Sequence, residues 1–140
     1  MRINKPKIIF DACALVSFLK PQPNEPGLKL LESYFGKFAM STISIAEVID
    51  VLMRKDVKRD TALDVVKFSI KESFMLKPDL EIAFLAGEIR SKYAKPPYEL
   101  SMADCFCLAH ANMLGLPVIT ADKTWDKIAK HVGVKIIQYK

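Results

Sequence analysis

Five short apolar segments alternate with longer segments of helical pattern, and this alternation constrains the fold more than any other feature of the sequence. The apolar segments, each expected to form a strand, are residues 7–10, 37–41, 73–77, 117–120 and 134–139. Helices are expected at residues 12–19, near 26–35, and at 44–55, 60–71, 79–94, 101–114 and 122–132. Strands that alternate with helices form a parallel sheet with helices on both faces. The sequence therefore predicts an α/β protein with three layers.

Length and composition are those of one globular domain, expected to span residues 1–140. No apolar run approaches the roughly 20 residues of a membrane span. The apolar run near the N-terminus meets Asp11 after three residues, too early for a signal peptide, so a cytoplasmic protein without membrane association is expected. The net charge of +5 weakly favours anionic partners such as nucleic acid. The three cysteines, Cys13, Cys105 and Cys107, are interpreted as small core residues.

Four acidic residues lie where an open parallel sheet binds ligands, beyond the carboxyl ends of its strands. Asp11 directly follows the first expected strand, and Asp122 comes two residues after the end of the fourth, Thr120. Glu47 lies in the first turn of the helix after the second strand. Asp104 lies in the first turn of the helix that runs back before the fourth strand. All four carboxylates are therefore candidates for one site.

Each acid also has an ordinary structural interpretation. The segments 44–47 and 101–104 both read Ser-x-x-acid, which fits a capping box at a helix start. Asp122 fits an N-cap of the last helix, as Asp60 fits an N-cap of the helix at 60–71. Asp11 would favour the positive end of the helix that follows it. Taken singly, each acid is about as consistent with a cap as with a catalyst.

The apolar neighbours of Asp11, Glu47 and Asp104 favour the second interpretation, because acids in such surroundings are costly to desolvate without a compensating charge. Divalent cations relieve the repulsion among several carboxylates. Oxygen ligands without a thiolate or imidazole cluster suit Mg²⁺ or Mn²⁺. The four acids together therefore predict a metal site. His110 and His131 receive no role in it, and Asp126 is interpreted as a solvated helix residue.

Other phosphate-handling sites are excluded by missing motifs. The sequence contains neither a P-loop nor a G-x-G-x-x-G segment. Asp11 is followed by Ala12 and Cys13, which excludes the D-x-D pattern of haloacid-dehalogenase-like phosphatases. A response-regulator receiver would need an aspartate after the third strand, where Lys77 and Pro78 stand instead.

The remaining pattern resembles the PIN domain, and most closely VapC-type toxin ribonucleases. The resemblance is carried by IIFDACALVSFL, STISIAEVIDVL, ELSMADCFCLAHANMLGLPVIT and TADKTW, in the family's order and over nearly the whole chain. It implies a five-stranded sheet in the order 3-2-1-4-5. It also implies that the metal is held by four residues, Asp11, Glu47, Asp104 and Asp122. Thr120 would then support the site, and Trp125 would pack beneath it.

The resemblance further implies a Mg²⁺- or Mn²⁺-dependent endoribonuclease that hydrolyses RNA phosphodiester bonds. Such a protein would be the toxin of a VapBC-type pair, held inactive by a small VapB-like antitoxin, and a homodimer. The alternative is a PIN domain outside such a pair, acting in RNA processing or as a catalytically weak scaffold for RNA or protein. Cys13 departs from the Ser or Thr of many relatives, which puts hydrogen-bonding support for Asp11 in doubt.

Two surfaces are candidates for partners. The segment 90–99 interleaves basic and aromatic residues suited to unpaired RNA bases, although charged loops are usually only solvated; its candidate contacts are Arg90, Lys92, Tyr93, Lys95 and Tyr98. The helices at 44–55 and 60–71 carry apolar residues beyond what one core needs, and in the resembling toxins this pair forms the antitoxin groove. The candidates there, for each of which core packing is the main alternative, are Val48, Val51, Leu52, Ala62, Val65 and Val66.

Overall fold

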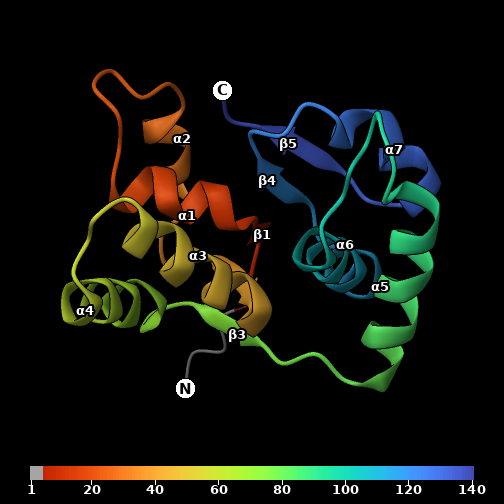
Figure 1. Ribbon diagram of the computed structural model, residues 1–140, viewed down its shortest axis with the longest axis horizontal. Coiled ribbons are helices and arrows are strands. Elements are labelled where there is room, and N and C mark those ends of the chain that lie inside the picture. Colours follow the sequence, from red (N-terminus) through yellow and green to blue (C-terminus); the bar gives the residue numbers. More distant parts are fainter. Residues whose placement is uncertain (1–4) are drawn as a thin grey trace.

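The computed structural model describes residues 5–140, and its centre is one parallel sheet of five strands in the order β3-β2-β1-β4-β5 (Figure 1). The strands are β1 (Ile8–Phe10), β2 (Phe38–Ser41), β3 (Phe74–Leu76), β4 (Val118–Thr120) and β5 (Ile136–Gln138). Each hydrogen-bonded pair of strands is parallel. The α/β class and the strand order are therefore confirmed. The strand order places β1 and β4, which precede Asp11 and Asp122, side by side.

Seven helices connect these strands and cover both faces of the sheet (Figure 1). They are α1 (Ala12–Leu19), α2 (Leu28–Ser33), α3 (Thr42–Arg54), α4 (Arg59–Ile70), α5 (Leu80–Tyr93), α6 (Met102–Leu114) and α7 (Trp125–Val132). One core lies between the sheet and α5, α6 and α7, and a second lies between the sheet and α1 to α4. None of the helices within residues 5–140 is both long and apolar enough to cross a membrane.

Alternation along the strands separates the two cores. Ile8 and Phe10 of β1 pack in the core with α1 to α4, whereas Ile9 between them packs in the other core. Side chains point to opposite faces at successive strand positions, so a strand covered on both faces must be apolar throughout. This explains why the three inner strands are fully buried and the edge strands β3 and β5 are only half-buried.

The expected helix starts are wrong at α3 and α4, and also at α7, which begins at Trp125 rather than at residue 122. Helix α3 begins at Thr42 with Ser41 as its N-cap, whose hydroxyl accepts a hydrogen bond from the Ile43 amide at 3.2 Å. Strand β2 therefore runs into the helix without a loop, and Glu47 lies in the second turn rather than in a capping box. Helix α4 has Lys58 at its N-cap, and Asp60 lies in the first turn, where it forms an exposed ion pair with Arg59.

The apolar positions proposed for a partner surface on α3 and α4 are mostly core. Val48, Leu52, Ala62 and Val66 are buried against the sheet and the neighbouring helices, and only Val51 and Val65 are half-buried. These four residues lie on the inner sides of α3 and α4, because both helices pack on the same face of the sheet. The interpretation of these four as interface residues is therefore wrong, and their alternative as core residues is confirmed.

The turn before α2 is shaped by a close approach to the C-terminal segment. Gly27 has a φ of +78°, and a Cβ added there would lie 1.8 Å from the carbonyl oxygen of Tyr139. Gly36 has a similar φ of +82°, but a Cβ there would meet no atom within 4 Å. The first glycine is therefore required by both backbone conformation and space, and the second by conformation alone.

We predict that Gly27→Ala lowers the free energy of unfolding by about 3 kcal/mol or more, because the alanine adds a backbone collision to the strain of a positive φ. Gly36→Ala is the matched control and should lower it by only about 1–2 kcal/mol, the cost of the left-handed conformation. Urea unfolding followed by circular dichroism measures both values. Equal losses for the two variants would contradict the close packing of Tyr139 on Gly27.

Candidate metal centre

Asp11 is the buried centre of the candidate site. It follows β1 directly and is the N-cap of α1, where its Oδ1 accepts a hydrogen bond from the Ala12 amide at 2.8 Å. Its residue is 6% exposed. The capping interpretation and the site interpretation of Asp11 are therefore compatible, because Oδ2 is directed to other partners.

Thr120 joins Asp11 to the end of the neighbouring strand. Its hydroxyl donates to Asp11 Oδ2 at 2.8 Å and accepts from the Asp122 amide at 3.1 Å. Thr120 is fully buried, and the Asp11 amide donates to the Ile119 carbonyl at 3.1 Å. Thr120 therefore lies between the acids that follow β1 and β4.

Cys13 also contacts Asp11. Its Sγ donates to Asp11 Oδ2 at 3.2 Å and lies 3.6 Å from the Thr120 hydroxyl. Burial, followed by the charge of Asp11, raises the pKa of this thiol to about 12, so the thiol stays protonated and can donate. The hydrogen-bonding support for Asp11 that the cysteine at position 13 put in doubt is therefore present in the structure. Of the three cysteines interpreted as core residues, Cys105 and Cys107 are buried and Cys13 is half-buried at the site.

Asp104 forms the capping box expected at the start of α6. The Ser101 hydroxyl accepts from the Asp104 amide at 3.1 Å, and Asp104 Oδ2 accepts from the Ser101 amide at 2.9 Å. This half-buried carboxylate is nevertheless within electrostatic range of the other acids, since its charge raises the pKa values of Asp11 and Glu47. Capping and membership of the acidic group therefore coexist at Asp104.

Glu47 and Asp122 complete the group from α3 and from the loop after β4. Both are half-buried. Asp122 is not the N-cap of α7, which begins three residues later at Trp125. Its Oδ1 instead accepts from the amide and the hydroxyl of Thr124, at 2.9 and 2.7 Å. Trp125 is fully buried in the core below, as expected.

The four carboxylates repel one another. Burial, then the charge of Asp104, raises the pKa of Asp11 from 3.8 to about 7, although hydrogen bonds from Thr120 and Cys13 lower it. Burial and the charge of Asp104 likewise raise the pKa of Glu47. The pKa of Asp104 is raised by burial and by the charge of Asp122. Such mutual repulsion is what a bound cation would relieve.

In their present rotamers the acids do not enclose an ion. Within residues 5–140, no three acidic, histidine or cysteine side chains stand close enough to hold a metal together. Asp104 and Asp122 direct an oxygen each to local backbone amides, those of Ser101 and Thr124. The donor chemistry of these carboxylates fits a hard divalent cation.

A second layer of polar contacts behind Cys13 was not predicted. The Tyr139 hydroxyl donates to the Cys13 carbonyl at 3.2 Å and is 2.8 Å from the Ser17 hydroxyl. Tyr139 and Ser17 are both buried. No local sequence pattern predicts the contact between Ser17 and Tyr139, because these residues lie 122 positions apart and meet only when β5 joins the sheet.

The basic and aromatic segment at 90–99 is partly committed to the fold. Arg90 donates from Nε to the Leu100 carbonyl at 2.7 Å. Tyr93 and Tyr98 are half-buried and pack edge to face, with ring centroids 5.2 Å apart. Lys92 and Lys95 are exposed at the surface. Only part of the segment is therefore available to a ligand.

The chain resembles known proteins in sequence and in fold. The sequence matches the PIN domain over residues 8–131. The chain belongs to the PIN domain family. This is a family of nucleases, and the structural neighbours of the chain are VapC toxins of VapBC systems. No curated protein sequence gives a significant match.

Three solved structures illustrate the likeness. DNA-bound VapBC from Salmonella typhimurium has a TM-score of 0.75 at 22% identity, covering 96% of this chain and 99% of its own. FitAcB from Neisseria gonorrhoeae has a TM-score of 0.64 at 26% identity, covering 93% and 96%. VapC20 from Mycobacterium tuberculosis, described as a sarcin-ricin loop cleaving toxin, has a TM-score of 0.72 at 14% identity, covering 86% and 93%. For the Salmonella and Mycobacterium structures, which are less than 25% identical to this chain, the likeness shows the fold alone.

We predict that Asp11→Asn stabilises the metal-free protein in a pH-dependent way. Because the folded-state pKa of Asp11 is about 7 rather than 3.8, ionising this carboxyl destabilises the fold increasingly as the pH rises between these values. The variant should therefore match the wild type near pH 4 and exceed it by about 2–4 kcal/mol at pH 8. Urea unfolding in chelator measures this difference. Asp60→Asn, at an exposed acid, is the control, and a pH-independent gain for Asp11→Asn would contradict the burial argument.

Proposed function

We propose that this chain, as a single domain over residues 1–140, is a Mg²⁺- or Mn²⁺-dependent endoribonuclease that hydrolyses RNA phosphodiester bonds. The observation that carries the proposal is the electrostatic coupling of Asp11, Glu47, Asp104 and Asp122 at the carboxyl edge of the sheet. Membership of a nuclease family supports it. Catalysis in the cytoplasm, where RNA is found, is part of the same proposal.

The cation would be held by carboxylate oxygens, with Asp11 and Asp104 as direct ligands, then Glu47, and Asp122 directly or through water. Bound there, it would hold the scissile phosphate and favour attack by water. Thr120 and Cys13 keep the Asp11 carboxylate in one orientation through hydrogen bonds to Oδ2. Ser101 keeps Asp104 at the same edge through the capping box. The chain thus supplies positioned negative charge rather than a histidine base.

We predict that Asp11→Asn and Asp104→Asn each reduce Mg²⁺-dependent cleavage of single-stranded RNA by at least 100-fold, because each removes a charge that holds the cation. Calorimetry with Mn²⁺ should show weakened ion binding for the same variants. Asp60→Asn, which alters an acid whose side chain is 88% exposed on α4, should behave as the wild type in both assays. Full cleavage by the Asp11 variant would remove the proposed site.

We also propose that the chain is the toxin of a VapBC-type pair and binds a small antitoxin. An apolar groove of about 290 Å³ lies between α1, α4 and the turn before β2, lined mainly by Phe18, Leu19, Phe35, Val65 and Phe68. Phe68 is 72% exposed, which is unusual for a large apolar residue with no partner to cover it. The likeness to VapBC structures supports the existence of a protein partner.

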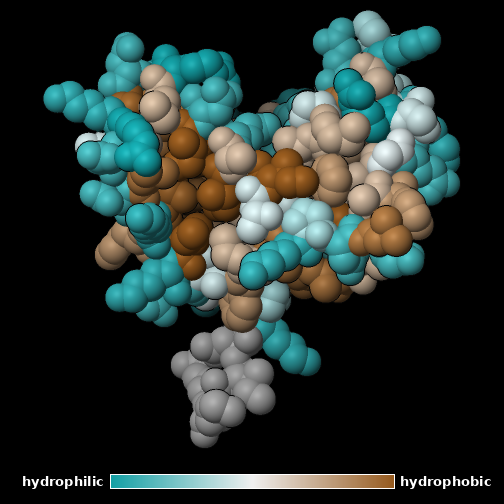
Figure 2. Space-filling view, turned by 60° about the horizontal axis from the view of Figure 1, so that its bottom comes forward, coloured by the Kyte–Doolittle hydropathy of each residue, from teal (hydrophilic) through white to brown (hydrophobic). Residues whose placement is uncertain are grey.

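A homodimer is the second association that we propose. Leu80 and Phe84 of α5 are exposed, as are Met113 and Leu114 at the end of α6. Hydrophobic side chains also gather left of the centre of the face shown in Figure 2 and reach into its middle, with hydrophilic residues around them. Exposed apolar surface of this kind favours self-association.

We predict that two matched substitutions separate these associations. Phe68→Glu should weaken antitoxin binding at least 10-fold and leave the oligomeric state unchanged, because only α4 is altered. Phe84→Glu, at a residue 63% exposed, should give a monomer that still binds the antitoxin. Sedimentation and binding to the product of a neighbouring antitoxin gene measure the two effects. Identical behaviour of the two variants would contradict the assignment of separate surfaces.

A second candidate function is a PIN domain outside a toxin pair, acting in RNA processing or as a scaffold with weak catalysis. It is favoured by the hydrogen bonds that Asp104 and Asp122 accept from nearby backbone amides, because these bonds already give the two carboxylates a structural role. The two functions differ in cells. Expression of a toxin should arrest growth, Asp11→Asn should abolish the arrest, and an antitoxin reading frame should lie upstream. A scaffold should show neither effect and should bind Mn²⁺ weakly.

A further inference from the structure

A groove between α5 and α7, away from the acidic centre, has a volume of about 430 Å³. Its α5 wall carries Glu88, Lys92 and Tyr93, and its other wall is the last turn of α7 with Lys130 and His131. Volumes of this size hold small organic ligands. Lys92 and Tyr93 belong to the segment 90–99 predicted to contact RNA, whereas Glu88, Lys130 and His131 have no role in the acidic centre or in the proposed protein interfaces.

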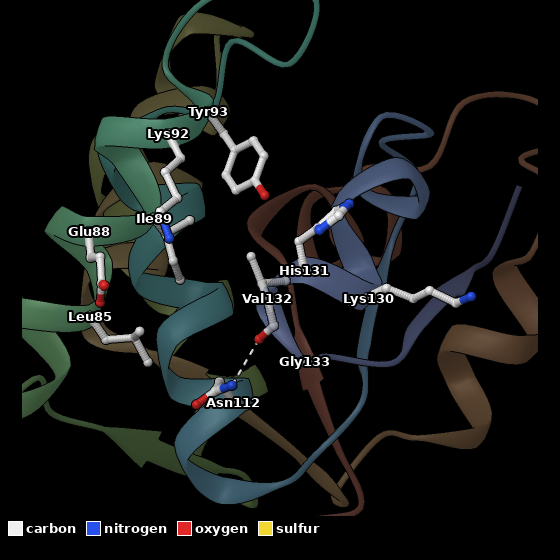
Figure 3. Close-up of a pocket in the computed structure, with 10 residues that line it drawn as sticks. All are labelled: Leu85, Glu88, Ile89, Lys92, Tyr93, Asn112, Lys130, His131, Val132 and Gly133. Atoms are coloured by element: carbon white, nitrogen blue, oxygen red, sulfur yellow. Dashed lines mark hydrogen bonds between the residues drawn. The ribbon is translucent and has the colours of Figure 1, made fainter.

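The floor of the groove is held in place by contacts between three helices. Asn112 of α6 donates from Nδ2 to the Val132 carbonyl at 2.8 Å, which fixes the end of α7 against α6 (Figure 3). Gly133 ends α7 with a φ of +66°, and a Cβ there would lie 3.1 Å from the Asn112 amide nitrogen. Ile89, 5% exposed, closes the α5 side. The groove is therefore a formed feature of the fold rather than a gap between loose loops.

One aromatic ring faces the open space. Figure 3 shows Tyr93 projecting from α5 toward α7, with its hydroxyl in the gap and the His131 ring across from it. Tyr98 packs at right angles on Tyr93, with 5.2 Å between ring centroids. This contact holds the Tyr93 ring in one orientation. A fixed aromatic ring at a cavity wall is suited to stacking with a flat base.

Positive charge lies at the rim. Lys92 and Lys130 stand on opposite walls, both exposed, and the one acid among the lining residues is Glu88. Figure 3 shows the Lys130 side chain extending from α7 in the direction away from α5. Proteins bind unpaired RNA by stacking its bases on aromatic rings and by contacting its phosphates with basic residues. The groove has both kinds of residue.

The groove is connected to the acidic centre through a short stretch of backbone. The Leu100 amide donates to the Tyr93 carbonyl at 3.0 Å, and Ser101, the next residue, caps α6 together with Asp104. The Tyr93 end of the groove therefore lies beside the helix end that carries Asp104. A strand of RNA leaving the carboxylates can continue along α5 into the groove.

We propose that the α5–α7 groove binds one unpaired nucleotide of the RNA substrate, next to the cleaved bond, with the base against Tyr93 and the phosphates at Lys92 and Lys130. The proposal rests on the proposed ribonuclease function for the identity of the ligand. It reassigns the predicted RNA contacts, since Arg90 and Tyr98 serve as supports and residues of α7 join the site.

Binding of RNA, separate from cleavage, tests the proposal. The probe is a fluorescein-labelled single-stranded RNA of 12 mixed nucleotides, titrated by anisotropy against the full chain carrying Asp11→Asn. Adding Lys92→Gln and Lys130→Gln should weaken binding about tenfold at 0.1 M salt and lower the slope of log Kd against log salt by about 1.4, the loss of two phosphate contacts. Lys29→Gln with Lys37→Gln, two exposed lysines outside the groove, is the charge-matched control and should change neither.

A second measurement locates the base. In NMR titrations with uridine and adenosine monophosphate, the Asn112 side-chain amide and the Tyr93 ring should shift, and Tyr93→Leu should abolish the shifts while urea unfolding confirms that it folds. Equal binding by groove and control variants, or shifts confined to other surfaces, would overturn the proposal. Loss of RNA binding in the groove variants together with absence of cleavage by the wild type would leave the groove assignment standing and remove the ribonuclease function.

Discussion

The hydrogen bond from Thr120 to Asp11 joins the ends of the two neighbouring strands β1 and β4, and the acidic centre depends on it. Its partners lie 109 residues apart, and both are buried. Without this donor, an aspartate with a pKa near 7 would face the other carboxylates with less to stabilise its charge. The same hydroxyl accepts from the Asp122 amide, so one side chain orients the exits of both strands. The strand order 3-2-1-4-5 makes this contact possible because it places β1 beside β4.

Burial and repulsion at this edge work against the stability of the fold. Asp11, Glu47 and Asp104 all have raised pKa values, which means that the folded chain holds their ionised forms less favourably than water does. A structural cap would be expected to lower the pKa of its acid, as the bonds from Ser101 alone do for Asp104. Acids kept in an unfavourable state are typical of functional sites. Helix caps explain where Asp11 and Asp104 lie, whereas the raised pKa values of these acids support the proposed cation site.

The parts of the fold that could be predicted are those set by local pattern. Apolar strands between helices specified the parallel sheet, and Ser101 with Asp104 specified a capping box because both partners lie within one helical turn. The predicted start of α3 is wrong because Ser41 is both the last residue of β2 and the N-cap of the helix. The sequence offers Ser44 as an equally suitable N-cap, and the strand pattern favours it over Ser41. Tyr139 over Cys13, and Lys130 across from Lys92, depend on which helices end up adjacent. No spacing in the sequence encodes such long-range proximity.

The capping box at α6 carries a consequence for how the helix and an ion would share atoms. Asp104 Oδ2 accepts from the Ser101 amide, so a cation that displaced this hydrogen bond would remove one of the two bonds of the capping box. The affinity of this site for an ion and the stability of the first turn of α6 would then be thermodynamically coupled. Substitutions that strengthen the capping box would then lower the affinity for metal, although no ligand is changed.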